Sequence, residues 1–214
     1  MKKNILVLAA VCFTLVMSSQ AQTKFGIRAG AQLFNTNAKD INGNKMDNTL
    51  KFGFHAGLTA DIPVAPDYFI QPGLLYSRKG ANHDYANSES ILSYIEVPVN
   101  FIYKPSLGNG KLLLGFGPYF GVLLDAKMEH VGGDETEAEI TNQIPANAPA
   151  TGYYVQRTDA GANFLAGYEF SRKFSVQLNA QLGLANIAPE DLRVANDKSN
   201  GKNTGFGLSV GYKF

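Results

Sequence analysis

The sequence predicts an all-β fold: an eight-stranded antiparallel up-and-down transmembrane β-barrel with its N- and C-termini on the periplasmic side. Three observations predict it. The chain begins with a leader typical of exported proteins, and eight long stretches then alternate between apolar and polar residues. The connections between these stretches alternate between long and short, as expected for a barrel with outer loops and periplasmic turns.

The leader covers residues 1–21. Lys2 and Lys3 precede an apolar run, and Ser19 and Ala21 are the small residues before the expected cleavage site. This organisation is typical of a secretory signal peptide. A membrane anchor is the alternative, but the apolar run is shorter than the roughly 20 residues that a spanning helix needs. We therefore expect one outer-membrane barrel domain over residues 22–214.

The leader also contains Cys12, the only cysteine in the chain. Lipidation of Cys12 is a second alternative for the leader, but Val11 does not suit the small residue expected before a lipidated cysteine. Without the leader the protein has no cysteine, which excludes disulfides, thiol nucleophiles and zinc–thiolate sites. Loss of Lys2 and Lys3 changes the formal net charge from +1 to −1, which argues against a general nucleic-acid binder.

Each of the eight stretches has an apolar face at every second position, which is the period of a β-strand. In the first, Phe25, Ile27 and Leu33 alternate with Gly26, Arg28 and Gln32. The expected strands are residues 24–34, 51–61, 68–79, 91–104, 111–125, 159–170, 173–184 and 205–214. The apolar faces of the second to fourth carry Phe52, Phe54, Leu58, Tyr68, Ile70, Leu74, Tyr76, Ile95, Val97, Val99, Phe101 and Tyr103. Those of the last four carry Leu112, Leu114, Phe116, Phe120, Val122, Phe164, Tyr168, Phe170, Phe174, Val176, Leu178, Leu182, Phe206, Leu208, Val210, Tyr212 and Phe214.

The length of these stretches favours a membrane barrel over a soluble one. Strands of globular proteins usually have about 5 or 6 residues, whereas roughly 9 to 11 residues cross a bilayer at the tilt of a barrel strand. The opposite face carries small and polar residues, which fit the narrow interior of an eight-stranded barrel better than the large apolar ones do. Aromatic residues near strand ends, such as Tyr68, Tyr76 and Tyr212, suggest girdles at the membrane interfaces.

The connections give a separate test. Residues 36–50, 80–90, 126–158 and 185–201 form long connections, and short ones lie between them. A barrel with periplasmic termini predicts this order. The final alternating residues Phe206, Leu208, Val210, Tyr212 and Phe214 resemble the terminal-strand signal that the bacterial outer-membrane assembly machinery reads.

Several segments together resemble the PorT-like family of outer-membrane β-barrel proteins. They are residues 53–58, 70–80, 94–99, 115–119 and 167–170. Gly73 departs from the family pattern, which has a glutamate at this position. The resemblance implies an eight-stranded barrel in the outer membrane. It also suggests a role in type IX secretion or gliding, because some relatives serve there.

The polar face supplies the candidate site, a hydrogen-bonded network of paired charges inside the barrel. The alternatives are a proton or small-ion path through the interior, and a calcium site in the acidic third long loop. The network residues are Arg28, Asp61, Gln71, Lys79, Glu96, Asn100, Asp159, Asn163, Glu169, Gln177, Asn179, Gln181 and Lys213. The acidic loop residues are Glu129, His130, Asp134, Glu135, Glu137 and Glu139.

We expect no catalysis and no cofactor. The histidines, His55, His83 and His130, lie on separate segments, and the local set His83, Asp84 and Ser88 is common in polar loops. The sequence therefore predicts a structural or interaction barrel. A secretion-machine subunit and a soluble periplasmic ligand-binding barrel are the alternatives. The expected partners are outer-membrane lipid, the barrel-assembly machinery and envelope proteins that meet the outer loops.

Overall fold

The computed structural model describes residues 23–83, 87–130, 132–149, 151–170 and 173–214. The expected signal peptide, residues 1–21, lies outside the described residues. Among the residues that are described, no helix has the length and apolar character needed to cross a membrane.

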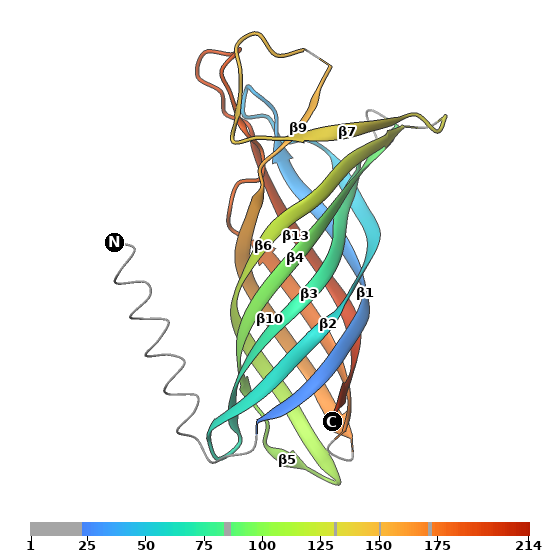
Figure 1. Ribbon diagram of the computed structural model, residues 1–214, viewed down its shortest axis with the longest axis vertical. Coiled ribbons are helices and arrows are strands. Elements are labelled where there is room, and N and C mark those ends of the chain that lie inside the picture. The colour runs from blue at the N-terminus through green and yellow to red at the C-terminus, as the bar shows by residue number, and fades with distance from the viewer. Residues whose placement is uncertain (1–22, 84–86, 131, 150, 171–172) are drawn as a thin grey trace.

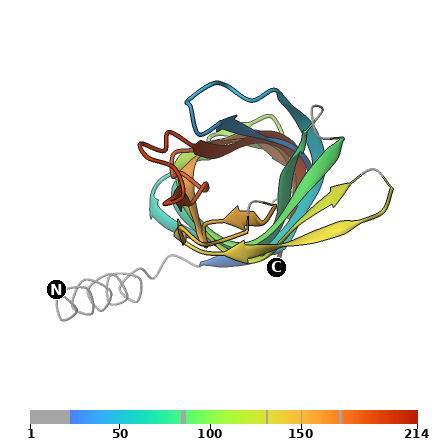
Figure 2. The ribbon, with the colours of Figure 1, turned by 90° about the horizontal axis from the view of Figure 1, so that it is seen from above.

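Eight long strands form one closed ring, in which every neighbouring pair is antiparallel. Consecutive long strands are neighbours, and the pairing of β1 with β13 closes the ring. Figures 1 and 2 show the strands tilted around an enclosed interior. The predicted eight-stranded up-and-down barrel is confirmed. The strands are β1 (Lys24–Lys39), β2 (Asn48–Ala65), β3 (Tyr68–His83), β4 (Ser88–Tyr103), β6 (Gly110–His130), β10 (Thr158–Phe170), β11 (Phe174–Gly183) and β13 (Asn200–Lys213).

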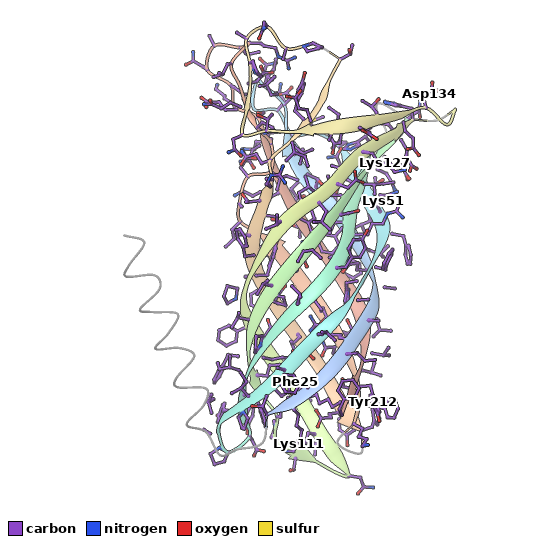
Figure 3. All side chains as sticks on the ribbon, in the orientation of Figure 1. Phe25, Lys51, Lys111, Lys127, Asp134 and Tyr212 are labelled. Carbon is purple, nitrogen blue, oxygen red and sulfur yellow. The ribbon has the colours of Figure 1, made fainter. Side chains whose placement is uncertain are left out.

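The apolar face points outward and the polar face points into the ring. In β13, Leu208 and Val210 are 51% and 57% exposed, whereas Ser209 between them is 1% exposed. Figure 3 shows side chains all around the outer wall. A soluble ligand-binding barrel would place its apolar face inside. That alternative is therefore wrong, and the outward apolar face predicted from the sequence is confirmed.

Aromatic residues gather where the short turns lie. The rings of Tyr68 and Tyr103 stack with centroids 4.8 Å apart, and those of Phe174 and Tyr212 lie 4.9 Å apart. This grouping matches an interfacial aromatic girdle. Tyr76 differs from the prediction, because β3 continues well past it and leaves this ring in the middle of the strand.

Several strands continue beyond their predicted ends, mostly toward the long connections, and β2 also continues to Ala65 beside a short turn. Residues 80–90 were expected to form a long loop, but β3 and β4 stay paired from Gly80 opposite Ile91 to His83 opposite Ser88. The connection left between the two strands is short, so the predicted strict alternation of long and short connections is wrong at this point. The backbone groups of the expected loop find their hydrogen-bond partners in the extended sheet instead.

The longest connection folds over the mouth of the ring. It contains β7 (Glu135–Ile140), β8 (Gln143–Ile144) and β9 (Tyr153–Val155). β8 pairs with β12 (Glu190–Asp191) of the last long connection, so the two connections form one cap. Figure 2 looks down on this cap. At the opposite end the short β5 (Ser106–Leu107) pairs with β6.

An apolar cluster closes the interior beneath the cap. We call it the outer plug, and its members are Leu92, Tyr94, Leu123, Ala126, Val155 and Ile187. The first four point inward from β4 and β6, and the last two come from the cap connections. Each is less than a tenth exposed. The interior is therefore apolar beneath the cap, and the buried charges lie below this plug.

Candidate functional site: the barrel interior

Four ionised side chains form a closed group near the short-turn end, which we call the lower ion cluster. Asp61 of β2 forms ion pairs with Lys104 and Lys213. Glu169 of β10 pairs with the same two lysines, at 3.3 and 3.0 Å. Gln71 donates from Nε2 to Oδ1 of Asp61 at 2.6 Å. Each charge has two opposite neighbours, which offsets part of the cost of removing it from water.

The upper ion cluster centres on Lys79 of β3. Its Nζ forms ion pairs with Glu96 and, at 3.2 Å, with Asp159. Asp159 also accepts hydrogen bonds from Asn203 Nδ2 at 3.0 Å and from the Tyr119 hydroxyl at 3.2 Å. The Lys79 Nζ lies 4.5 Å from the centroid of the Tyr119 ring, within cation–π range. Asp159 is fully buried, and all of its measured contacts stabilise its charge.

A neutral hydrogen-bonded layer also crosses the interior. Gln32 Nε2 donates to Ser77 Oγ at 2.9 Å and lies within hydrogen-bond distance of two backbone carbonyls, which fixes its Oε1 as the atom facing His55. His55 Nδ1 therefore carries the hydrogen, and Nε2 accepts from the Ser209 hydroxyl at 2.8 Å. Asn179 Nδ2 donates to Ser209 Oγ at 2.6 Å. These bonds hold several strands together.

Arg28 stands beside an interior cavity of about 40 Å³. Asn100 and Gln181 also line it, and Arg28 Nε, Asn100 Oδ1 and Gln181 Oε1 are buried without a protein hydrogen-bond partner. Within the described part of the chain Arg28 forms no ion pair, although Glu96 is near enough to attract it. Space for a water molecule needs roughly 10–15 Å³ on this measure. The cavity thus fits a few bridging water molecules and nothing larger.

A second interior space, of about 10 Å³, lies between Arg28 and the lower ion cluster. Arg28 lines both spaces, so its side chain separates them. With the outer plug above and the lower ion cluster below, the described residues enclose two small spaces rather than an open pore.

Every residue predicted for the interior network lies on the inner face. Asp61, Gln71, Glu169 and Lys213 meet in the lower ion cluster, and Lys79, Glu96 and Asp159 meet in the upper one. Gln181 donates to Glu96 at 3.3 Å, and Gln177 donates to Asn179 at 2.6 Å. Arg28, Asn100 and Asn163 line the cavity. That these residues act as a functional set remains a prediction.

Residues 18–188 match the model of a protein family described as outer membrane protein beta-barrel domain. The chain belongs to this family. No curated protein matches it.

Solved structures of outer-membrane barrels resemble the chain at low sequence identity. Ail, the attachment invasion locus protein of Yersinia pestis, crystallised with the heparin analogue sucrose octasulfate, is 15% identical, with 90% of this chain and 99% of that chain covered and a TM-score of 0.43. OprG of Pseudomonas aeruginosa is 14% identical, with 89% and 95% covered and a TM-score of 0.48. A major outer membrane protein from Thermus thermophilus is 12% identical, with 90% and 100% covered and a TM-score of 0.49.

The interior of this family member contains residues that the sequence analysis did not select. Lys104 completes the lower ion cluster, and it directly follows β4 at an even position, like the inward residues Glu96 and Asn100. The alternation of inward and outward positions along the strand could therefore have identified Lys104 from the sequence. Gln32 and His55 were likewise on polar faces. Ile102 is different, because it packs inside the ring with Leu113 and Leu165, and no alternation of polarity reveals an inward apolar residue.

Ser209, His55 and Gln32 lie in the order of a nucleophile, a base and an orienting group. In hydrolytic triads the third group is usually a carboxylate, which stabilises the imidazolium that forms during the reaction. Gln32 is neutral and cannot do this. The adjoining cavity holds only water-sized molecules. The three side chains form a buried hydrogen-bond chain.

The acidic residues of the third long connection lie on a hairpin of β6 and β7 outside the ring. Lys127 Nζ contacts Glu129 and Glu135, each at 2.7 Å. The hydrogen bond from Lys127 lowers the pKa of Glu129 and keeps it ionised. Among the described residues no three His, Cys, Asp or Glu side chains are grouped to hold a metal ion. The glutamates of β7, at positions 135, 137 and 139, are exposed.

Proposed function

We propose that this outer-membrane barrel does not conduct and acts through its folded cap, as a structural or interaction protein rather than an enzyme. The closed interior carries the proposal. Ion clusters, a neutral layer and the outer plug fill the ring in succession, and the remaining spaces measure about 40 and 10 Å³. A barrel filled in this way offers no path for a solute.

The cap is the surface available for interaction. The pairing of β8 with β12 joins the two longest connections, and Arg193 forms a further contact between these two connections. Its guanidinium pairs with Asp191 at 2.7 Å and donates to the Pro149 carbonyl at 2.6 Å. A surface held by such contacts is pre-organised, which lowers the entropic cost of binding a partner. We place the cap outside the cell and the short turns in the periplasm.

Two finer assignments belong to the same proposal. The outward row Phe206, Leu208, Val210, Tyr212 and Phe214 would be read by the barrel-assembly machinery during insertion. The resemblance to PorT-like proteins supports a second candidate, an accessory subunit of a type IX-like secretion or gliding machine. Envelope proteins would then be the partners that meet the cap.

Gene deletion with side-by-side assays of secretion, envelope integrity and surface attachment tests the function. The deletion strain is complemented with the wild type or with a variant whose residues 132–156 are replaced by a short glycine–serine linker. We expect the linker variant to insert but to fail in the assay that deletion affects. Full complementation by the linker variant contradicts a role for the cap. A defect confined to secretion favours the machine subunit, and planar-bilayer conductance of the purified wild type contradicts the closed interior.

A further inference from the structure

An apolar groove runs down the outer wall over β10, β11 and β13. It consists of two adjoining hollows of about 450 and 660 Å³ that share Phe164, Ala180 and Phe206. Ala180 stands between two outward phenylalanines that are 52% and 54% exposed, so the small side chain leaves a depression between large ones. We call this the wall groove. Its lining is mostly apolar, which suits a hydrocarbon chain.

The upper end of the groove has a polar lip. Asn37 and Thr204 line the upper hollow, and Asn37 Nδ2 donates to Thr204 Oγ1 at 3.2 Å. Lys202 faces Asn37 across the β1–β13 pair, and Lys39 lies two positions beyond Asn37 on the same outward face. Two cations thus stand on neighbouring strands directly above the lip, at the spacing of diagonal neighbours in a sheet.

Within the described residues neither Lys39 nor Lys202 forms an ion pair. The nearby carboxylates of Asp40 and Asp197 accept hydrogen bonds within their own loops, from the backbone amides of residues 42 and 44 and of residues 191 and 199. Asp47 is the remaining carboxylate of the first loop, and it lies at the surface.

Two more lysines reinforce the positive rim. Lys45 forms a backbone bridge with Lys39, and the Lys198 amide donates to the Ile41 carbonyl at 3.2 Å, which joins the first and last loops. Both lysines lie at the surface. Four lysines therefore border the lip against three carboxylates, so the net charge of the lip is positive.

We propose that the wall groove and the lysines above it bind one phosphate-bearing lipid of the outer leaflet. An acyl chain lies in the groove between Phe164 and Phe206, and the phosphate meets Lys39 and Lys202. The groove supplies apolar burial, and the lysines supply the charge attraction that anionic headgroups give to basic residues near a membrane surface. This inference rests on the membrane orientation given under the proposed function.

Charge argues against a second copy of the chain as the occupant. Two barrels in one membrane share the same orientation, so a contact through this wall would bring the two lysine rims side by side at the same height. Like charges placed together in this way are destabilising. An anionic headgroup instead neutralises them.

Native mass spectrometry of the mature barrel in detergent tests the site, with phosphatidylglycerol and diacylglycerol as probes. We expect tighter retention of phosphatidylglycerol. At about 1 kcal/mol for each lysine near a headgroup, the double variant Lys39→Gln with Lys202→Gln weakens it about 30-fold. The matched control, Lys111→Gln with Lys173→Gln at the short-turn end, leaves retention unchanged. An excess of inorganic phosphate does not displace the lipid, because the groove supplies part of the affinity.

A second pair of variants tests the groove. Ala180→Phe fills it and weakens retention of both lipids, whereas Ala56→Phe on the outward face of β2 has no effect. Equal retention of the two lipids by the wild type, or no loss in the lysine double variant, overturns the lipid site. So does a dimer that Ala180→Phe dissociates while lipid retention stays constant. For every variant, the electrophoretic mobility of the folded barrel and its conductance in a planar bilayer are also measured. Failure of the lipid site and failure of the proposed function are then distinguishable.

Discussion

The lower ion cluster makes a quantitative prediction for Asp61→Asn. At a separation of about 3 Å and an effective dielectric constant near 20, a pair of opposite charges attracts with roughly 5 kcal/mol before solvation is counted. The substitution removes two such contacts and leaves Lys104 and Lys213 with only Glu169. It also removes the desolvation cost of one carboxylate, which is several kcal/mol. The expected net loss in the free energy of unfolding is about 3–5 kcal/mol.

Urea unfolding in lipid vesicles, followed by the folded fraction in electrophoresis, measures this loss. The control is Asp67→Asn, because Asp67 pairs with Lys111 at 3.1 Å on the surface and its positive φ of 62° also suits asparagine. We expect the control to change stability by less than about 1 kcal/mol. A double variant with Lys213→Gln should recover part of the loss, because it restores neutrality. If Asp61→Asn costs no more than the control, the buried cluster does not stabilise the barrel as argued.

Three further predictions concern other parts of the molecule. Ser209→Ala leaves His55 Nε2 without its hydrogen-bond donor and should cost about 1–3 kcal/mol in urea unfolding; a loss below that of an exposed serine substitution would contradict it. Gly80→Ala places a Cβ 1.9 Å from a β4 carbonyl oxygen, so it should destabilise the extended sheet and speed hydrogen exchange there, and unchanged exchange would refute the close approach. The hydrogen bond from Arg193 lowers the pKa of Asp191, so its contribution is present above the ordinary value of about 4 and is lost as the pH falls through the lowered pKa. An NMR titration of the Arg193 amide should show that transition in the wild type and not in Asp191→Asn.

The ring and its inside-out polarity could be predicted because each strand carries its own evidence. Leu208 and Ser209 differ in polarity, and the strand period assigns them to opposite faces without knowledge of any other strand. The ends of the strands were harder to predict. Around Ile91, residues on both faces are buried: Ile91 is 2% exposed, and Leu92 on the other face belongs to the outer plug. The alternation of polarity therefore fades at the paired ends of β3 and β4, and the sequence there resembles a loop.

The pairing of charges inside the ring could not be predicted. Lys79 and Asp159 are separated by 80 positions and meet only because of the register and closure of the ring. The alternation of inward and outward positions can place each residue in the interior, but it cannot predict which anion pairs with which cation. The cavity beside Arg28 was also beyond prediction, because it depends on the volumes of side chains from several strands at one level.

The charge pairing inside the ring has a consequence for biogenesis. Asp61 of β2 pairs with Lys213 of β13, and these strands come together only when β1 pairs with β13, whereas the pair of Lys79 with Asp159 joins β3 to β10 across the interior. Before closure Asp61 has Lys104 but lacks Lys213, while the hydrophobic exterior already favours entry into the lipid. Closure therefore adds the second cation to Asp61, so the last strand to join completes the lower ion cluster.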